Sequence, residues 1–241
     1  MPNVLITGSS RGIGAAIAGQ LRASGASVIG HATRAIDENT IAADFSEPVA
    51  PQMLWTEALE RSDGRIDVLV NNAGLFASNP LDSSDIEWLD TWEDSLRINL
   101  TAAAQLSRFA VRHWRASGIK GRIVHIASRA GHRGDSPDHW HYAASKAGML
   151  ALHKTMARAY AAEGILSFAI APGFTDTART GATGASDYLE SRGGDRLLAG
   201  IPLGRVATPD EIARIAAFCA LFAPESMTGA VIDANGASYV R

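Results

Sequence analysis

Short apolar runs rich in β-branched residues alternate along the chain with longer segments of helical periodicity. The apolar runs predict strands at residues 3–7, 26–30, 41–44, 66–71, 122–127, 166–171 and 230–233. The periodic segments predict helices at residues 14–24, 49–61, 91–116, 141–162 and 209–222. Because the strands are nearly continuous in apolar residues, we expect helices on both faces of a parallel sheet. The pattern predicts one α/β domain over residues 1–241, with a doubly wound parallel sheet of about seven strands.

Composition excludes several classes of protein. Apolar residues make up 46% of the 241 residues and charged residues 20%, which is enough apolar surface for a buried core. The charges of the 22 basic and 25 acidic residues nearly cancel, and the basic residues are not gathered in a run. We therefore expect neither nucleic acid nor a membrane as partner. With no signal peptide and no apolar run near the ~20 residues that span a bilayer, the expected location is the cytoplasm. The single cysteine, Cys219, is expected in the core.

Three glycines, Gly8, Gly12 and Gly14, lie between the first predicted strand and the first predicted helix. A glycine permits the tight turn, another lets the backbone approach a pyrophosphate, and a third lets the helix pack on the strand. The helix start adds free N–H donors for a phosphate. An ordinary strand-to-helix turn would not need three glycines in seven residues, so a dinucleotide site is the better interpretation.

The segment from Thr7 to Gly14 resembles the TGxxxGIG motif of the short-chain dehydrogenase/reductase family at every specified position. The resemblance extends over essentially the whole chain and implies a Rossmann-type fold that binds NAD(P). It implies cofactor contacts at Gly8, Ser10, Arg11, Gly12, Ile13, Gly14, Thr33, Arg34, Asp44, Phe45, Asn72, Ala73, Gly74, Tyr142, Lys146, Pro172, Gly173, Thr175 and Thr177.

The end of the second predicted strand indicates which nicotinamide cofactor binds. An acidic residue there hydrogen-bonds the ribose 2′-hydroxyl of NAD and would repel the 2′-phosphate of NADP. In this chain the acidic position falls on Ala32, followed by Thr33 and Arg34, and Arg11 resembles the basic residue of NADP-preferring members. We therefore expect NADP(H) rather than NAD(H); Arg34 is alternatively a solvated loop charge.

Tyr142 and Lys146 are four residues apart at the start of a predicted helix and so project from one face. A phenol with a pKa of about 10 is a poor base at pH 7, and a nearby ammonium lowers that pKa. Ser128, at the end of a predicted strand, can donate a hydrogen bond to a substrate oxygen. It precedes Tyr142 by 14 residues, whereas the family usually has about 13, so its placement departs from the family pattern. Asn99 resembles the family asparagine that kinks a helix and holds a relay water.

These four residues, Asn99, Ser128, Tyr142 and Lys146, imply by resemblance an oxidoreductase that interconverts a carbonyl and an alcohol. We expect the substrate wall from residues 129–141, from the loop after Gly74, and from a glycine-rich lid at about 174–204. The polar lid favours a small or polar carbonyl compound. The irregular spacing of the nearby histidines, without a cysteine, argues against a metal site.

The remaining predictions concern partners. Many alanines on the helices at 91–116 and 141–162 permit close packing between subunits, and the resemblance implies a homo-oligomer, either a tetramer or a dimer. Arg129 and Arg133 alternatively meet an acidic carrier protein, as in the 3-oxoacyl-carrier-protein reductases that the chain also resembles. A non-enzymatic NADP-binding regulator on the same fold is a further alternative. A pure binding protein has no need of a phenol beside an ammonium, which favours the enzyme.

Overall fold

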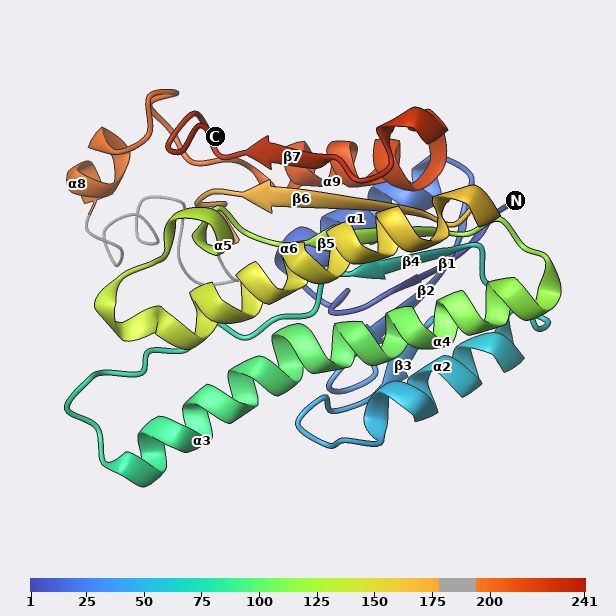
Figure 1. The fold of residues 1–241 in the computed structure, drawn as a ribbon, viewed down its shortest axis with the longest axis horizontal. Helices are drawn as coiled ribbons and strands as arrows, with labels where there is room; N and C mark the ends of the chain where they lie inside the picture. The colour runs from blue at the N-terminus through green and yellow to red at the C-terminus, as the bar shows by residue number, and fades with distance from the viewer. Residues whose placement is uncertain (178–193) are drawn as a thin grey trace.

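The computed structural model describes residues 1–177 and 194–241, and within them seven strands form one sheet (Figure 1). The strands are β1 (Asn3–Ile6), β2 (Ser27–Ala32), β3 (Thr40–Ala42), β4 (Val68–Asn71), β5 (Arg122–Ile126), β6 (Leu166–Pro172) and β7 (Val231–Ala234). All neighbours in the order β3-β2-β1-β4-β5-β6-β7 are parallel. The predicted α/β fold with a parallel sheet is confirmed, and every predicted strand overlaps an observed one.

The helices cover both faces of this sheet. They are α1 (Gly12–Ala23), α2 (Ala50–Arg61), α3 (Asp85–Leu96), α4 (Ala102–Ser117), α5 (Ala130–Arg133), α6 (Trp140–Tyr160), α8 (Gly194–Ala199) and α9 (Pro209–Ala217). Shorter turns are the π turns η1 (Arg97–Thr101) and η4 (Phe218–Phe222) and the 3-10 turns η2 (Pro137–His139), η3 (Ala161–Glu163) and η5 (Glu225–Met227). Figure 1 shows α4 and α6 in front of the sheet and α1 and α9 behind it. None of the described helices is long and apolar enough to span a bilayer.

The two larger apolar cores hold the layers together, one on each face of the sheet. On the α1 and α9 side, Ile17, Leu21 and Ile212 pack against strand residues such as Ile6 and Phe168. The other core joins α2 and α4 to the sheet through residues that include Leu54, Leu106 and Trp114. Cys219 belongs to the first core, where burial raises the pKa of its thiol to about 11. The apolar strands predicted from the sequence are therefore covered from both sides.

The long front helix begins earlier than the predicted residue 91. Helix α3 begins at Asp85 because Ser84 caps it: the Ser84 hydroxyl accepts from the Glu87 N–H, and the Glu87 carboxylate accepts from the Ser84 N–H. The prediction missed this start because apolar residues of the first turns, such as Ile86, are exposed and break the helical pattern. The helix then continues through the π turn η1 into α4.

The segment predicted as a lid without periodicity, 174–204, is only partly described. Residues 178–193 lie outside the described part of the chain, and with them Gly181, Gly184 and Gly193. The described end of the segment contains α8, which the sequence pattern did not predict. The wall predicted at 129–141 likewise contains the short helix α5 and the turn η2.

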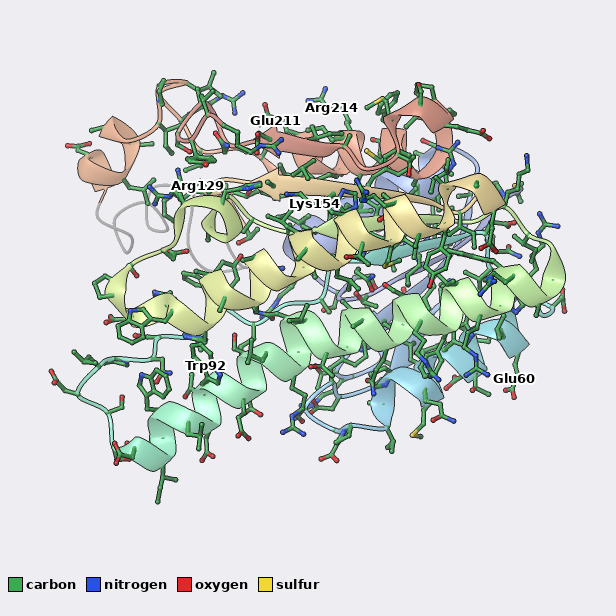
Figure 2. The ribbon with its side chains drawn as sticks, viewed as in Figure 1. Glu60, Trp92, Arg129, Lys154, Glu211 and Arg214 are labelled. Atoms are coloured by element: carbon green, nitrogen blue, oxygen red, sulfur yellow. The ribbon has the colours of Figure 1, made fainter. Side chains whose placement is uncertain are left out.

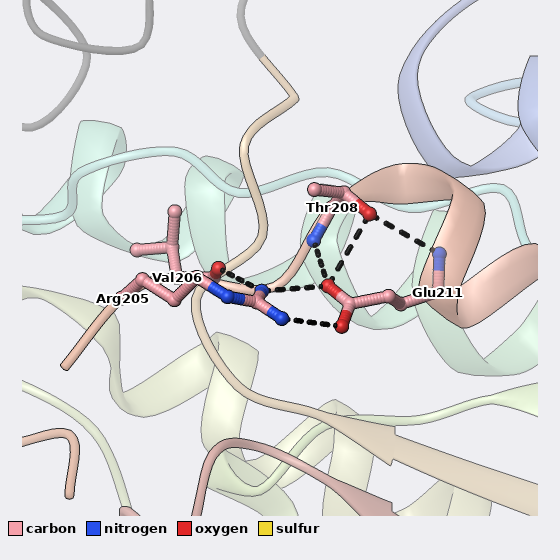
Figure 3. Close-up of polar contacts among 4 residues, drawn as sticks. All are labelled: Arg205, Val206, Thr208 and Glu211. Atoms are coloured by element: carbon pink, nitrogen blue, oxygen red, sulfur yellow. Dashed lines mark hydrogen bonds and ion pairs between the residues drawn. The ribbon is translucent and has the colours of Figure 1, made fainter. Parts of the chain in front are cut away.

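Helix α9 is fixed at its start by four residues (Figure 3). The Thr208 hydroxyl accepts from the Glu211 N–H, and both oxygens of the Glu211 carboxylate accept from the Arg205 guanidinium at 2.8 Å. The Arg205 hydrogen bonds, together with that from the Thr208 N–H, lower the pKa of Glu211 to about 2. This cap holds the chain just after Ala207, whose N–H donates to the Phe174 carbonyl and whose strand bridge joins it to Thr175.

Candidate active site

The carboxyl ends of the strands meet at the edge of the sheet where α5 lies (Figure 1). The chain runs from β1 outward to β3 and then returns to place β4 on the other side of β1. In open α/β sheets, ligands bind at the carboxyl edge beside such a reversal of strand order. The loops after β1 and β4 meet there.

The turn between β1 and α1 requires its glycines. Gly8 has a φ of +67°, which L side chains rarely adopt, and a Cβ on Gly14 would lie 2.0 Å from the Gly8 carbonyl oxygen. Helix α1 has no side-chain cap at Arg11 and no acidic residue in its first turn. Its first N–H groups are therefore available to an anion such as a pyrophosphate.

His31, at the end of β2, holds this turn and was missed by the sequence reasoning. Its Nδ1 accepts from the Gly8 N–H at 3.1 Å, its Nε2 lies 2.9 Å from the Ala43 carbonyl oxygen, and its ring stacks on Phe45 with centroids 4.2 Å apart. Burial lowers the pKa of His31 to about 4, so the ring is neutral near pH 7. The partners require the proton on Nε2. A histidine in an otherwise apolar strand was the available signal.

A long groove runs along this turn, and we call it the glycine-turn groove. Thirteen of the predicted cofactor residues line it: Gly8, Ser10, Arg11, Gly12, Ile13, Gly14, Thr33, Asp44, Phe45, Asn72, Ala73, Gly74 and Thr177. Arg34 does not line it and is exposed. The Asp44 carboxylate accepts from the Ser46 N–H and hydroxyl, and these bonds lower the pKa of Asp44.

A second pocket, which we call the catalytic cavity, adjoins this groove and has a volume of about 300 Å³. The predicted residues that line it are Ile13, Asn72, Gly74, Ser128, Tyr142, Lys146, Pro172, Gly173, Thr175 and Thr177. Gly74 and Thr177 belong to both walls, so the two spaces are continuous. Thr177 reaches across to the glycine turn, since a Cβ on Gly12 would lie 3.2 Å from the Thr177 side chain.

The Tyr142 and Lys146 side chains are held side by side on α6. The Lys146 Nζ lies 5.8 Å from the centroid of the Tyr142 ring and donates to the Ile126 carbonyl oxygen at 2.8 Å. Burial lowers the pKa of Lys146 to about 8, which still leaves it charged at pH 7. The Ser128 hydroxyl oxygen, on the same cavity wall, accepts from the Ala130 N–H at 3.1 Å. Ser128 is thus in the cavity despite its unusual spacing from Tyr142.

Asn99 lies behind the cavity wall, in the π turn η1, and is fully buried. Its Oδ1 accepts from the Leu75 N–H at 2.6 Å, and its Nδ2 donates to the Leu75 carbonyl and to the Ser145 hydroxyl. Ser145 in turn donates to the Tyr142 carbonyl oxygen at 2.8 Å. A Cβ on Gly74 would lie 3.5 Å from the Asn99 Oδ1 and 3.6 Å from the Lys146 Nζ. Asn99 therefore links the loop after β4 to the first turn of α6.

Aromatic rings and histidines line the approach to Tyr142. Phe76 packs edge-on against the Tyr142 ring at 4.7 Å and stacks on His139 at 4.0 Å. His141 is turned away, with its Nε2 3.1 Å from the Ala77 carbonyl oxygen, and His132 stacks on Tyr239. In residues 1–177 and 194–241, no group of three or more His, Cys, Asp or Glu side chains could hold a metal ion.

A glycine turn at the strand reversal, opening onto a cavity with a Tyr-Lys pair and a serine, defines a dinucleotide-dependent oxidoreductase. The family model for short chain dehydrogenase matches residues 2–187, and the chain belongs to that family. It is 36% identical to the 3-oxoacyl-(acyl-carrier-protein) reductase FabG of Escherichia coli K12, over 98% of this chain and 96% of that protein. The protein of the same name from Haemophilus influenzae is 34% identical, over 98% of this chain and 97% of that protein.

A solved structure is also similar, with a TM-score of 0.83 and 30% identity over 98% of this chain and 95% of that one. It is an Agrobacterium tumefaciens protein assigned as a 2-deoxy-D-gluconate 3-dehydrogenase, with NADP bound. The relatives are named as reductases and dehydrogenases. The protein is thus an oxidoreductase that acts on C=O and CH–OH groups, and the prediction of an enzyme rather than a cofactor-binding regulator is confirmed.

Proposed function

We propose that the protein is an NADP(H)-dependent carbonyl reductase in which Tyr142 is the general acid and base. The proposal is carried by the arrangement of the two spaces. Ser128, Tyr142 and Lys146 line one cavity, and Gly74 and Thr177 line both this cavity and the glycine-turn groove. A cofactor in the groove and a carbonyl in the cavity would meet there.

The groove favours NADP(H) over NAD(H). Ala32 and Thr33 line it at the end of β2, where an NAD-binding site has a carboxylate, and Arg11 lines it from the glycine turn. Among the described residues of this wall only Asp44 is acidic, and its carboxylate accepts hydrogen bonds from Ser46. A guanidinium without a nearby competing carboxylate suits the 2′-phosphate. The similar structure from Agrobacterium tumefaciens contains NADP, which supports the proposal.

The residues of the cavity have distinct roles in the reaction. NADPH, when bound, supplies the hydride that reduces the carbonyl carbon. Ser128 and Tyr142 hold the carbonyl oxygen by hydrogen bonds, and Tyr142 passes its phenolic proton to that oxygen as negative charge develops. The charged Lys146 favours the resulting phenolate, and Asn99 positions the first turn of α6 through Ser145. The reverse sequence oxidises an alcohol.

We also propose that the protein forms a homo-oligomer through α3 and α6. Large apolar side chains are exposed on this surface, among them Ile86, Leu89 and Trp140. Trp140 packs edge-on against Trp88, with centroids 6.2 Å apart, so α3 and the start of α6 present one apolar surface. Covering it with a second copy would remove that apolar area from water. Tetramer and dimer both satisfy this requirement.

A second candidate function is the reduction of 3-oxoacyl groups on a carrier protein, because the two reductases that share 34–36% identity with this chain carry that name. It uses the same four catalytic residues and differs in how the carbonyl is delivered.

NADPH oxidation over a panel of ketones, aldehydes, 3-oxoacyl thioesters and 3-oxoacyl carrier protein tests both candidates. We expect reduction of small carbonyl compounds, and Tyr142→Phe should lower kcat by at least about 100-fold because the general acid is lost. The control is NADPH binding, which we expect Tyr142→Phe to change by less than about threefold. If only the carrier-bound substrate is reduced, the second candidate is right. If NADPH binds but no carbonyl is reduced, both are wrong.

A further inference from the structure

Arg129 lies in the wall of the catalytic cavity and has no role in the reaction described above. Arg129 directly follows Ser128, so their Cα atoms are about 3.8 Å apart. It is only 7% exposed and lines the cavity. Its backbone N–H donates to the Pro172 carbonyl oxygen at 3.0 Å, which fixes it between β5 and β6. Figure 2 shows Arg129 beside α5, at the carboxyl edge of the sheet.

The guanidinium of Arg129 lies close to an aromatic ring. Its central carbon lies 4.6 Å from the centroid of the Phe174 ring, which also lines the cavity. The positive charge is attracted to the ring, and this contact does not use the N–H donors of the guanidinium as hydrogen bonds to an oxygen. Within the described residues, Arg129 forms no ion pair with a carboxylate.

The surroundings of Arg129 make it a cation in need of an anion. Burial lowers its pKa, the charge of Arg133 lowers it further, and Asp135 opposes them. Arg133 and Asp135 also line the cavity, but both are exposed, and the Asp135 carboxylate accepts from the Ser136 N–H. A buried guanidinium without a partner is costly unless a ligand pairs with it.

We propose that Arg129 binds a carboxylate of the substrate, so that the substrates are small oxo acids whose carbonyl faces Ser128 and Tyr142. The proposal rests on the proposed carbonyl reductase function and names its substrate class. A planar guanidinium pairs with a carboxylate through two parallel hydrogen bonds, which fixes orientation as well as affinity. Arg129 has little exposed surface and lines a cavity of about 300 Å³, so a small acid fits it better than an acidic protein.

Matched pairs of substrates test the proposal. Pyruvate, acetoacetate and levulinate place the carboxylate one, two and three bonds beyond the carbonyl, and the methyl ester of each removes the charge. With NADPH, we expect the acid of the best spacing to have a kcat/KM at least about 10-fold above its ester. Arg129→Gln should bring that ratio close to one, and Arg129→Lys, which keeps the charge without the planar fork, should give an intermediate ratio. The control Arg108→Gln, an exposed arginine of α4 that also lies near a phenylalanine ring, should keep the wild-type ratio.

The outcomes separate this proposal from the proposed function. If wild type reduces esters as well as acids, or if Arg129→Gln keeps the acid preference, the proposal is wrong while the carbonyl reductase function holds. If none of the six compounds is reduced, the proposed function fails for them, and the acids are titrated into the NADPH complex by nicotinamide fluorescence. Binding that is at least about 10-fold weaker in Arg129→Gln supports the carboxylate site, and equal or absent binding overturns it. Reduction of 3-oxoacyl carrier protein that depends on Arg133 and not on Arg129 also overturns it.

Discussion

Lys146 carries its charge in the interior of the protein, and this has a measurable effect on stability. The side chain is 3% exposed and has one hydrogen-bond acceptor within the described residues, the Ile126 carbonyl oxygen. Burial lowers the pKa of Lys146 from 10.5 to about 8. This difference corresponds to about 3 kcal/mol, which the folded state loses at pH 7 because lysine is charged in both the folded and the unfolded chain.

The sign of the pH dependence follows from proton binding. Between pH 8 and pH 10.5 the unfolded chain binds more protons at Lys146 than the folded chain, so the stability of the wild type rises with pH in this range. The destabilisation that Lys146 causes is at its full value below pH 8 and vanishes above pH 10.5. From pH 7 to pH 9.5, about 2 kcal/mol of it should disappear.

Lys146→Met removes this charge and should therefore stabilise the protein at pH 7. Loss of the hydrogen bond to Ile126 offsets about 1 kcal/mol, which leaves a gain of about 2 kcal/mol. That gain should fall to less than about 0.5 kcal/mol at pH 9.5. Urea unfolding of the ligand-free protein at pH 7, 8, 9 and 9.5, followed by circular dichroism, measures it. Lys154→Met, which removes an exposed lysine from the same helix (Figure 2), is the control and should show no such change. A difference between wild type and Lys146→Met that stays constant from pH 7 to pH 9.5 would refute the reasoning.

Three further changes test other parts of the structure. Ala32→Asp should weaken NADPH binding by at least about 10-fold and spare NADH, because a carboxylate in the groove repels the 2′-phosphate; equal loss of both in fluorescence titrations contradicts this. Ser145→Ala should lower kcat by about 10-fold without changing NADPH binding, since it cuts the link from Asn99 to α6; steady-state kinetics with unchanged kcat would exclude that link. Glu211→Gln should lower thermal stability at pH 7 by no more than about 1 kcal/mol, and the difference should vanish as pH falls from 4.5 toward 2; a difference that persists at pH 2 argues against the cap.

The sheet could be predicted from the sequence because its strands are apolar along most of their length. Runs such as Val68 to Val70 are apolar on both faces since helices cover both faces of the sheet. The start of α3 was less predictable, because Ile86 is exposed and the hydrophobic pattern therefore begins a turn too late. Its true signal was the Ser84 and Glu87 pair, which acts through hydrogen bonds and leaves no trace in hydrophobicity.

The residues of the candidate site also fall into two groups, those that the sequence pattern revealed and those that it did not. Motif residues such as Gly14 and Lys146 could be found by spacing, because backbone approach and a shared helix face constrain sequence separation. His31 could not, since its partners Gly8 and Ala43 are brought to it by the parallel pairing of three strands. The burial of Arg129 was equally invisible, because it depends on how Phe174 folds over the end of β6. Contacts that the sheet creates between distant segments are what sequence reasoning lacked.

Two buried cations, Lys146 and Arg129, lie in one cavity, and burial lowers the pKa of each. Buried charges of this kind gather at functional sites because the same desolvation that lowers stability strengthens their interaction with a ligand or a reacting group. A ligand that binds only the folded chain stabilises it by about 2.7 kcal/mol at 100 times its Kd, comparable to the loss that Lys146 imposes. Lys146→Met should thus make the ligand-free protein more stable while it removes the charge that, in the proposed mechanism, favours the Tyr142 phenolate. Stability and the proposed activity are therefore opposed at this residue, because the proposed mechanism needs a buried charge that folding alone would not favour.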